Sequence, residues 1–240
     1  MSPILRGGDG LGEVDRVLRA LGSISSIKVN SSMGFHVHVN VEHLSLNELK
    51  KVCQNFIKYE DALDTLVPPS RRGTANTYCR SNRQAIGGDN QSMHAILGAC
   101  TSKQDLGNTM SPSKHYKFNM QNLVTGRQPT IEWRQHSSTY QKEKVMNWIR
   151  FCTAFVQNSA KLRSPSYISS NANDDELFEM MMMYVVKDRY LRDFYRQRRI
   201  DVLNPSNCCD GCASGHSCAG KSSDIFIPRP TYQVGYAELG

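Results

Sequence analysis

The chain has 240 residues, of which 39% are hydrophobic and 21% are charged, and its formal net charge is +7. This length is enough for one sizeable core, or for one core followed by a tail. The sequence contains no apolar run that could cross a bilayer and no secretory hydrophobic region, which excludes a membrane-spanning class and predicts no membrane partner. Eight cysteines without a secretory signal favour reduced thiols and a cytoplasmic protein.

The positive charge is compatible with an anionic ligand such as a nucleotide, or with nucleic acid. Many of the cations, however, lie in residues 187–199, where arginines are interspersed with tyrosines. A solvated helix face is the simplest explanation of such a run, so we expect no nucleic-acid partner.

The first quarter of the chain is predicted to combine short extended segments with helices. Residues 2–5 contain a proline and indicate the end of a strand. Apolar residues at helical spacing predict a helix over residues 9–22. Ser45, with Glu48 three residues later, forms a capping-box pattern and predicts a second helix, which stops at a Pro-Pro pair.

The rest of the chain is predicted to complete an α+β fold, with a curved, mainly antiparallel sheet and helices packed on one face. The expected elements are a loop at 70–90, a helix at 92–100, strands at 116–123 and 130–135 joined as a hairpin, and helices at 141–158, at 174–183 and from 188. From about residue 201 the composition changes to Asn, Ser, Gly, Cys and Pro. This predicts a folded domain over residues 1–200 and a disordered, Cys-rich tail over residues 201–240.

The most informative segment is the alternating run at residues 33–40, which predicts a β-strand. Side chains two residues apart in a strand share a face. The polar face carries His36, His38 and Asn40, and the apolar face carries Val37, Val39 and Val41. Two imidazoles and an amide on an open face predict a metal or anion site, and a solvated strand face with ordinary histidines is the alternative.

The second strand of the expected hairpin repeats this pattern. One of its faces carries Glu132, Arg134 and His136, the other carries Ile131, Trp133 and Gln135, and the neighbouring strand adds Lys117, Asn119 and Gln121. Charge on a buried sheet needs a partner, so we expect the polar faces to meet in one cradle. Carboxylate and imidazole groups there could bind a divalent metal, and the guanidinium could bind phosphate oxygens.

Two alternatives involve zinc. His36, His38 and Glu132 could bind Zn2+ and activate a water molecule, as in a zinc-dependent hydrolase. The tail contains a Cys-x-x-Cys pattern within Cys208, Cys209, Cys212, His216 and Cys218. These residues are closely spaced and a distant second half-site is absent, so a thiol-rich tail without metal is the preferred interpretation.

Several short motifs follow one another along the chain. They are Ser2-Pro3-Ile4-Leu5-Arg6-Gly7, Gly34-Phe35-His36-Val37-His38-Val39, Ser70-Arg71, Tyr78-Cys79, Tyr116-Lys117-Phe118-Asn119 and Ile131-Glu132-Trp133-Arg134-Gln135-His136-Ser137-Ser138-Thr139. Together they resemble the putative amidoligase family, which is related in fold to glutamate–cysteine ligase and glutamine synthetase. The resemblance covers roughly residues 2–158.

The resemblance implies an ATP-dependent carboxylate–amine ligase, in which ATP phosphorylates a carboxylate and an amine displaces the acyl phosphate to form an amide. The substrates would be small-molecule or peptide carboxylates and amines, with ATP and Mg2+ as cofactors. The implied site consists of metal ligands His36, His38 and Glu132, catalytic residues Glu132 and Arg134, cofactor-binding residues Arg71, Arg134 and Asn119, and a further candidate, His136. Such chemistry rests mainly on positioning and charge stabilisation.

The sequence departs from the family pattern at its start. Family members carry an earlier strand with paired acidic residues that bind the metals, whereas Met1 directly precedes Ser2-Pro3 here. We therefore expect a domain without that strand and without those metal ligands, because two imidazoles and one carboxylate are a poor set for octahedral Mg2+. An inactive ligase, or a non-catalytic nucleotide-binding protein, is the corresponding alternative.

Overall fold

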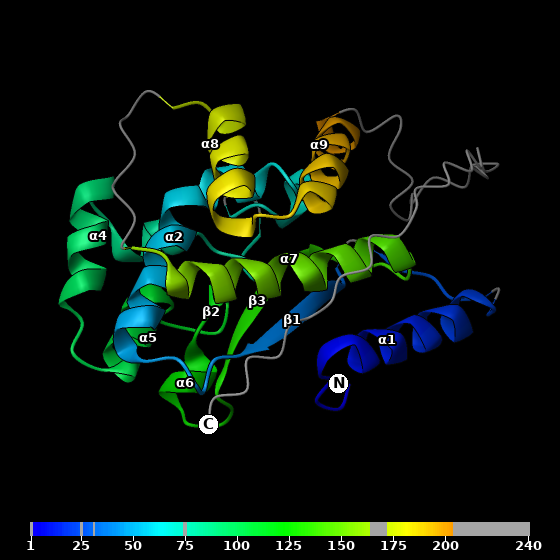
Figure 1. The fold of residues 1–240 in the computed structure, drawn as a ribbon, viewed down its shortest axis with the longest axis horizontal. Coiled ribbons are helices and arrows are strands. Elements are labelled where there is room, and N and C mark those ends of the chain that lie inside the picture. The colour runs from blue at the N-terminus through cyan, green and yellow to red at the C-terminus, as the bar shows by residue number, and fades with distance from the viewer. Residues whose placement is uncertain (1, 25, 31, 74–75, 164–171, 204–240) are drawn as a thin grey trace.

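The computed structural model describes residues 2–24, 26–30, 32–73, 76–163 and 172–203. Within them, three strands form one antiparallel sheet, in the order β1 (Gly34–Asn40), β3 (Thr130–Ser137) and β2 (Phe118–Asn119). Helices pack against this small sheet (Figure 1), which confirms the predicted α+β class. The more specific expectation of a glutamine synthetase-like architecture stays a prediction.

Two long helices cover the apolar face of the sheet, α2 (Leu46–Asp64) and α7 (Lys142–Lys161) (Figure 1). Trp133 of β3 is fully buried, and its ring centroid lies 5.4 Å from that of Phe56 on α2 and 5.3 Å from that of Phe155 on α7. The three valines predicted to face inward are buried as well. Each of these buried apolar side chains adds about 1.5–3 kcal/mol to the free energy of unfolding. Their burial fixes the orientation of the sheet, so its polar face points away from α2 and α7.

Helix α2 begins where the sequence predicts. The Ser45 hydroxyl accepts a hydrogen bond from the Glu48 amide at 3.3 Å, and the Glu48 carboxylate accepts one from the Ser45 amide at 2.8 Å. This reciprocal cap satisfies two backbone donors at the start of the helix. The last turns of α2 carry Glu60 and Asp64, and Glu60 is only 1% exposed.

A further layer packs on α2 and α7, on the side away from the sheet (Figure 1). It consists of α8 (Asp174–Met180), the π-helical segment η2 (Met181–Val186) and α9 (Arg189–Leu203). Met181 and Met182 are buried in the core, whereas Met183 is exposed. Helix α8 is capped by Asn173, whose side-chain oxygen accepts hydrogen bonds from the backbone amides of Asp175 and Glu176.

The predicted tail begins in a helix, because α9 continues to Leu203. Residues 204–240, with all the cysteines of the possible tail zinc site, lie outside the described residues. Cys53 and Cys152 are buried free thiols.

The N-terminal helix α1 (Gly7–Gly22) matches its prediction and contacts α7. An ion pair of 2.6 Å joins Asp15 of α1 to Lys142 at the start of α7. Residues 2–6 are not a strand, since no described segment pairs with them. Two further helices, α4 (Asn90–Ala99) and α5 (Lys103–Met110), follow in sequence, and the second of these was not predicted.

Two predicted segments differ in the structure. The strand expected at 116–123 is only two residues long. The Asn119 side chain accepts a hydrogen bond from the Gln121 amide at 2.9 Å, and the chain turns there into α6 (Gln121–Val124). The loop expected at 70–90 contains a 3-10 turn at Pro69–Arg71 and the short helix α3 (Asn82–Ile86). The prediction of these segments was therefore wrong in detail.

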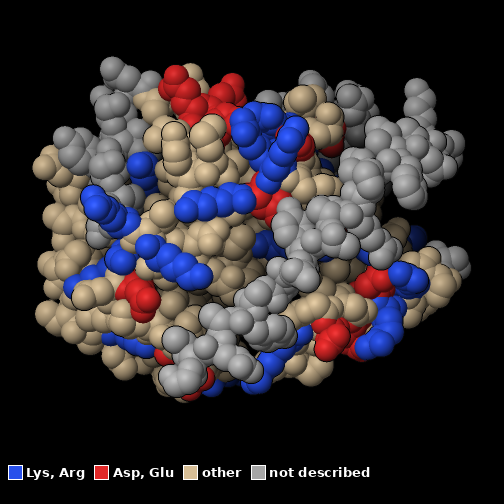
Figure 2. Space-filling view, in the orientation of Figure 1, with Lys and Arg blue, Asp and Glu red and all other residues tan. Residues whose placement is uncertain are grey.

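Three basic residues of α9, Arg189, Arg192 and Arg196, are at least partly exposed, as predicted, whereas Arg198 is only 4% exposed and the Arg199 guanidinium lies 4.5 Å from the centre of the Phe178 ring. Arg192 and Arg196 both contact Glu179, at 2.8 Å and 2.6 Å. On the face seen in Figure 2, Lys and Arg side chains are spread over several elements rather than gathered in one patch. None of the described helices combines the length and the apolar character that crossing a membrane requires.

Candidate functional site

The Glu132 carboxylate is the centre of the polar face of the sheet. Its Oε1 lies 3.0 Å from His36 Nδ1 and 2.6 Å from Arg134 Nη1, and its Oε2 accepts a hydrogen bond from Asn119 Nδ2 at 2.6 Å. His38 Nε2 lies 3.7 Å from the same Oε1. These five side chains form one cluster, called the Glu132 cradle below.

Strand register explains why the cradle forms. Glu132 stands directly opposite His38 in the β1–β3 pair and opposite Asn119 in the β2–β3 pair. Directly opposed residues in antiparallel strands project to the same face. The structure therefore brings together the polar side chains that the alternation of both strands predicts, while the roles assigned to them stay predictions.

The cradle favours an ionised Glu132 beside a neutral His38. Burial opposes ionisation of Glu132, but hydrogen bonds from His36 and Asn119 and the charge of Arg134 lower its pKa to about 2. Burial also lowers the pKa of His38, against the opposing effect of the Glu132 carboxylate. At neutral pH the Glu132 carboxylate is thus ionised and accepts hydrogen bonds from the donors around it.

Acid should therefore weaken the fold through Glu132. Its pKa of about 2 is below the ordinary value of 4.5, so its stabilising contribution is complete above about pH 5 and is lost as the pH falls through 2. We expect the free energy of unfolding to fall more steeply between these pH values in the wild type than in Glu132→Gln. Urea unfolding at several pH values measures this, and parallel pH profiles for the two proteins would contradict it.

Arg71 lies beside the cradle and is 4% exposed. Its Nη2 donates to the Arg134 carbonyl at 2.7 Å and its Nε donates to the Gln135 carbonyl at 3.3 Å. Gly34 makes this approach possible, because a Cβ there would lie 2.6 Å from Arg71 Nη2 and 2.8 Å from His36 Nε2. Two of the Arg71 donors are thus occupied by backbone carbonyls, and the described residues offer it no carboxylate partner.

His136 does not join the cradle, so the prediction that it shares a face with Glu132 is wrong. Two residues of β3, Arg134 and Gln135, face a single residue of β1. This bulge reverses the alternation of the strand. The His136 ring packs instead on Trp148 of α7, with 5.2 Å between centroids.

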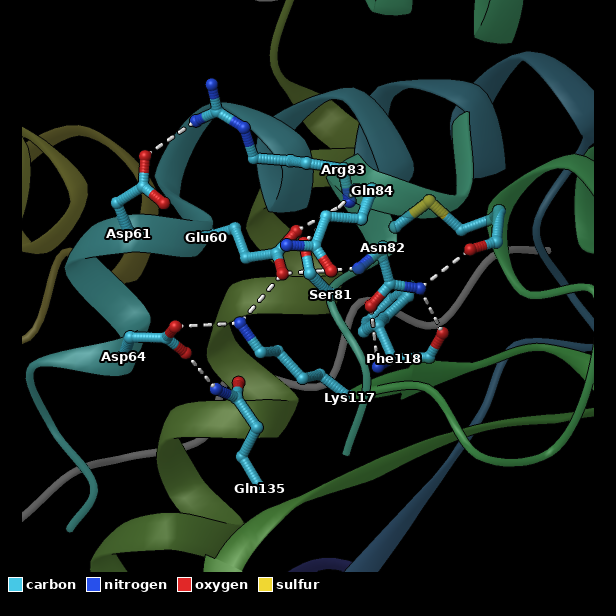
Figure 3. A network of polar contacts seen from close by, with 11 residues as sticks. Glu60, Asp61, Asp64, Ser81, Asn82, Arg83, Gln84, Lys117, Phe118 and Gln135 are labelled. Atoms are coloured by element: carbon cyan, nitrogen blue, oxygen red, sulfur yellow. Dashed lines mark hydrogen bonds and ion pairs between the residues drawn. The ribbon is translucent and has the colours of Figure 1, made fainter. Parts of the chain in front are cut away.

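Lys117 also leaves the face on which it was predicted. Its side chain is 2% exposed, and its Nζ donates to Glu60 Oε1 and Asp64 Oδ2, both at 2.8 Å (Figure 3). Gln135 Nε2 donates to the other Asp64 oxygen at 2.7 Å. The start of α3 also donates backbone amides to the Glu60 carboxylate, so this Lys117 network joins α2, α3 and the sheet.

Three residues at the site were not predicted to take part. His38 Nδ1 lies 3.2 Å from Thr130 Oγ1 and 3.4 Å from Asn122 Nδ2. The Cys79 thiol donates to the Arg134 carbonyl at 3.2 Å, and burial raises its pKa. The alternation of β3 gave a signal for Thr130, whereas Asn122 reaches the site only because α6 replaces the predicted strand.

The cradle does not fit Mg2+ by itself. Both oxygens of Glu132, its single carboxylate, are already engaged by cationic or amide donors, whereas Mg2+ requires several oxygen ligands. In the described part of the chain, no group of three or more His, Cys, Asp or Glu side chains is arranged to hold a metal ion. The assignment of His36, His38 and Glu132 as metal ligands thus has no geometric support and stays a prediction.

Comparisons with known proteins identify the family. Residues 1–156 match the family model described as "Putative amidoligase enzyme". Neither the curated proteins nor the solved structures include a match to the chain. The matched region contains the whole sheet and every residue of the cradle, and it spans well over half of the sequence. The chain belongs to this amidoligase family.

Proposed function

We propose that this chain is an ATP-dependent carboxylate–amine ligase that binds the phosphates of ATP at the Glu132 cradle. The convergence of Arg134, His36 and His38 on the open face of the sheet carries this proposal, together with membership of an amidoligase family. Guanidinium and imidazole groups are suitable donors to phosphate oxygens. Arg71 adds a second positive charge beside the single carboxylate of the cradle.

The proposed reaction has two steps. A carboxylate oxygen of the substrate attacks the γ-phosphorus of ATP, the bond to the bridging oxygen breaks, and ADP leaves. The amine nitrogen then attacks the acyl carbon, the bond to the phosphate oxygen breaks, and inorganic phosphate leaves as the nitrogen loses a proton. Positioning and charge stabilisation dominate such phosphoryl and acyl transfers.

The cradle residues would take different parts in this reaction. Arg134 uses Nη1 on Glu132, and its Nε donates to the Tyr78 carbonyl at 3.4 Å, so its Nη2 would hold phosphoryl oxygens. Glu132, fixed by Asn119, orients Arg134 and His36 in advance. Because the cradle does not fit Mg2+ by itself, no step is assigned to that ion.

Trapping of the acyl phosphate tests this function without knowledge of the natural amine. The full chain would be incubated with ATP, a panel of amino acids and short peptides, and hydroxylamine as the amine. We expect ADP and a hydroxamate to form together for the accepted carboxylate, and Glu132→Gln to lose both. ADP formation without hydroxamate for every carboxylate would contradict the acyl-phosphate step.

Binding of ATP separates the ligase from the alternatives. Isothermal titration would compare the wild type, Glu132→Gln and Arg134→Ala, each with and without Mg2+. Absence of binding in all three proteins would overturn the nucleotide proposal. Binding by the wild type with no turnover would indicate the non-catalytic nucleotide-binding alternative, and zinc retained through purification without any response to ATP would favour the hydrolase.

A further inference from the structure

The two bulge residues of β3 are both held by Lys117. The Lys117 carbonyl accepts the Arg134 amide at 2.9 Å. Its ammonium group binds Asp64, and the other oxygen of Asp64 accepts Gln135 Nε2 at 2.7 Å. Lys117 thereby fixes Arg134 through its own carbonyl and Gln135 through Asp64. Figure 3 shows the contacts of Asp64 with Lys117 and Gln135.

Arg71 holds the same two residues through their carbonyls. The Lys117 network therefore holds the bulge through the Arg134 amide and the Gln135 side chain. Arg71 holds it through the carbonyl groups of the same two residues. The Arg134 guanidinium, which reaches Glu132, extends from this bulge. Any displacement of the bulge would move Arg134 and Arg71 together relative to the cradle.

The surroundings of Lys117 rule out direct contact between its ammonium group and a substrate as the chain is folded. The side chain is 2% exposed, and Nζ lies between Glu60 and Asp64. Gly73 also covers it, because a Cβ on Gly73 would lie 2.9 Å from Lys117 Cε and 3.1 Å from Nζ. This buried cation with two carboxylate partners is placed to organise the site rather than to react in it.

We propose that Lys117 is a positioning residue for the cradle: held by Glu60 and Asp64, it fixes the bulge of β3 and so sets where the guanidinium groups of Arg134 and Arg71 lie. The identity of the ligand rests on the proposed function. The placement of the two guanidinium groups does not, and can be measured without a ligand.

A matched pair of variants on α2 tests the proposal. Asp64 and Asp61 lie one turn apart, and each contacts one cation at 2.8 Å, Lys117 for Asp64 and Arg83 for Asp61. Asp64→Ala breaks the side-chain link from Lys117 to Gln135 and leaves the Lys117 carbonyl on the Arg134 amide, while Glu60 still neutralises the lysine. Asp61→Ala removes an ion pair of the same length that does not contact the bulge, since Arg83 reaches Lys117 through its backbone amide and Glu60.

The position of the two arginines and the binding of ATP are measured in separate experiments. In the ligand-free protein labelled with 15N, we expect Asp64→Ala to shift the Nε–Hε resonances of Arg134 and Arg71, and Asp61→Ala to leave both unchanged. In titrations with ATP, we expect Asp64→Ala to bind about tenfold more weakly, since small displacements of positioning groups have large effects. The melting temperatures of both variants would be recorded to show that each protein is folded.

A second pair of variants, at Gln135 and Gln54, tests whether the effect of Asp64→Ala comes only from a local change in α2. Gln135 and Gln54 are both buried glutamines that donate through Nε2, to Asp64 at 2.7 Å and to the His94 carbonyl at 3.0 Å. Gln135→Met should reproduce the weaker binding of Asp64→Ala, and Gln54→Met should bind as the wild type does.

Each outcome bears on one proposal. Unchanged arginine resonances in both Asp64→Ala and Gln135→Met would overturn the positioning role, whether or not ATP binds. Shifted resonances in a protein whose wild type binds no ATP would support the positioning role and overturn the ligase proposal.

Discussion

Replacing Lys117 with Met should lower the free energy of unfolding by about 3–5 kcal/mol, the range found when one partner of a buried ion pair is removed. The two carboxylates raise the pKa of Lys117 despite its burial, so the lysine is charged at neutral pH. Without it, Glu60 and Asp64 face each other with no cation between them, and Glu60 is 1% exposed. In a chain of this size the loss corresponds to a decrease of roughly 6–20 °C in melting temperature.

Urea unfolding followed by circular dichroism measures this loss. The control is Lys51→Met, because Lys51 lies on α2, the helix that carries Glu60 and Asp64, and among the described residues its ammonium group donates only to a backbone carbonyl, that of Ala160, at 3.3 Å. Its effect should stay within about 0.5 kcal/mol. The triple variant Glu60→Gln, Asp64→Asn, Lys117→Met should recover most of the stability, since neutral groups carry a smaller desolvation cost. A loss below 1 kcal/mol in Lys117→Met would show that the ion pairs contribute little.

The parts of the fold that follow local rules could be predicted from the sequence. The capping box of Ser45 and Glu48 sets the start of α2, and the alternation around Val37 and Val39 sets both the extent and the orientation of β1. These signals depend only on neighbouring residues. The bulge at Arg134 depends instead on packing against α7 and on hydrogen bonds from distant segments, and no local pattern contains that information.

The same distinction applies to the site. Strand alternation is enough to bring Glu132, His36 and His38 to one face. The Lys117 network could not be predicted in this way, because β2 is too short to keep the side chain on the face of Asn119. One signal was present: Glu60 and Asp64 follow Phe56 at intervals of four residues, which puts two acids in line with an apolar face of α2. Acids in such a position require a buried partner.

Arg134→Ala should weaken ATP binding by about 10- to 100-fold, which corresponds to the roughly 1.5–3 kcal/mol typical of a charge-assisted hydrogen bond. The arginine is the cradle cation whose side chain reaches the open face of the sheet, with 13% of its surface exposed. Its removal also takes away the cation paired with Glu132, so an unneutralised carboxylate would lie next to the phosphates. Isothermal titration of the wild type and the variant with ATP measures the ratio of dissociation constants.

Arg134→Lys separates charge from geometry. Lysine keeps the positive charge but lacks the planar set of donors with which arginine can hold Glu132 and a phosphate at the same time. We therefore expect Arg134→Lys to bind ATP with an affinity between those of the wild type and Arg134→Ala. Arg192→Ala, on the surface of α9 and paired with Glu179 at 2.8 Å, should bind as the wild type does. Equal affinity in the wild type and Arg134→Ala would mean that the phosphates do not bind at Arg134, and the cradle would then be a structural cluster rather than a nucleotide site.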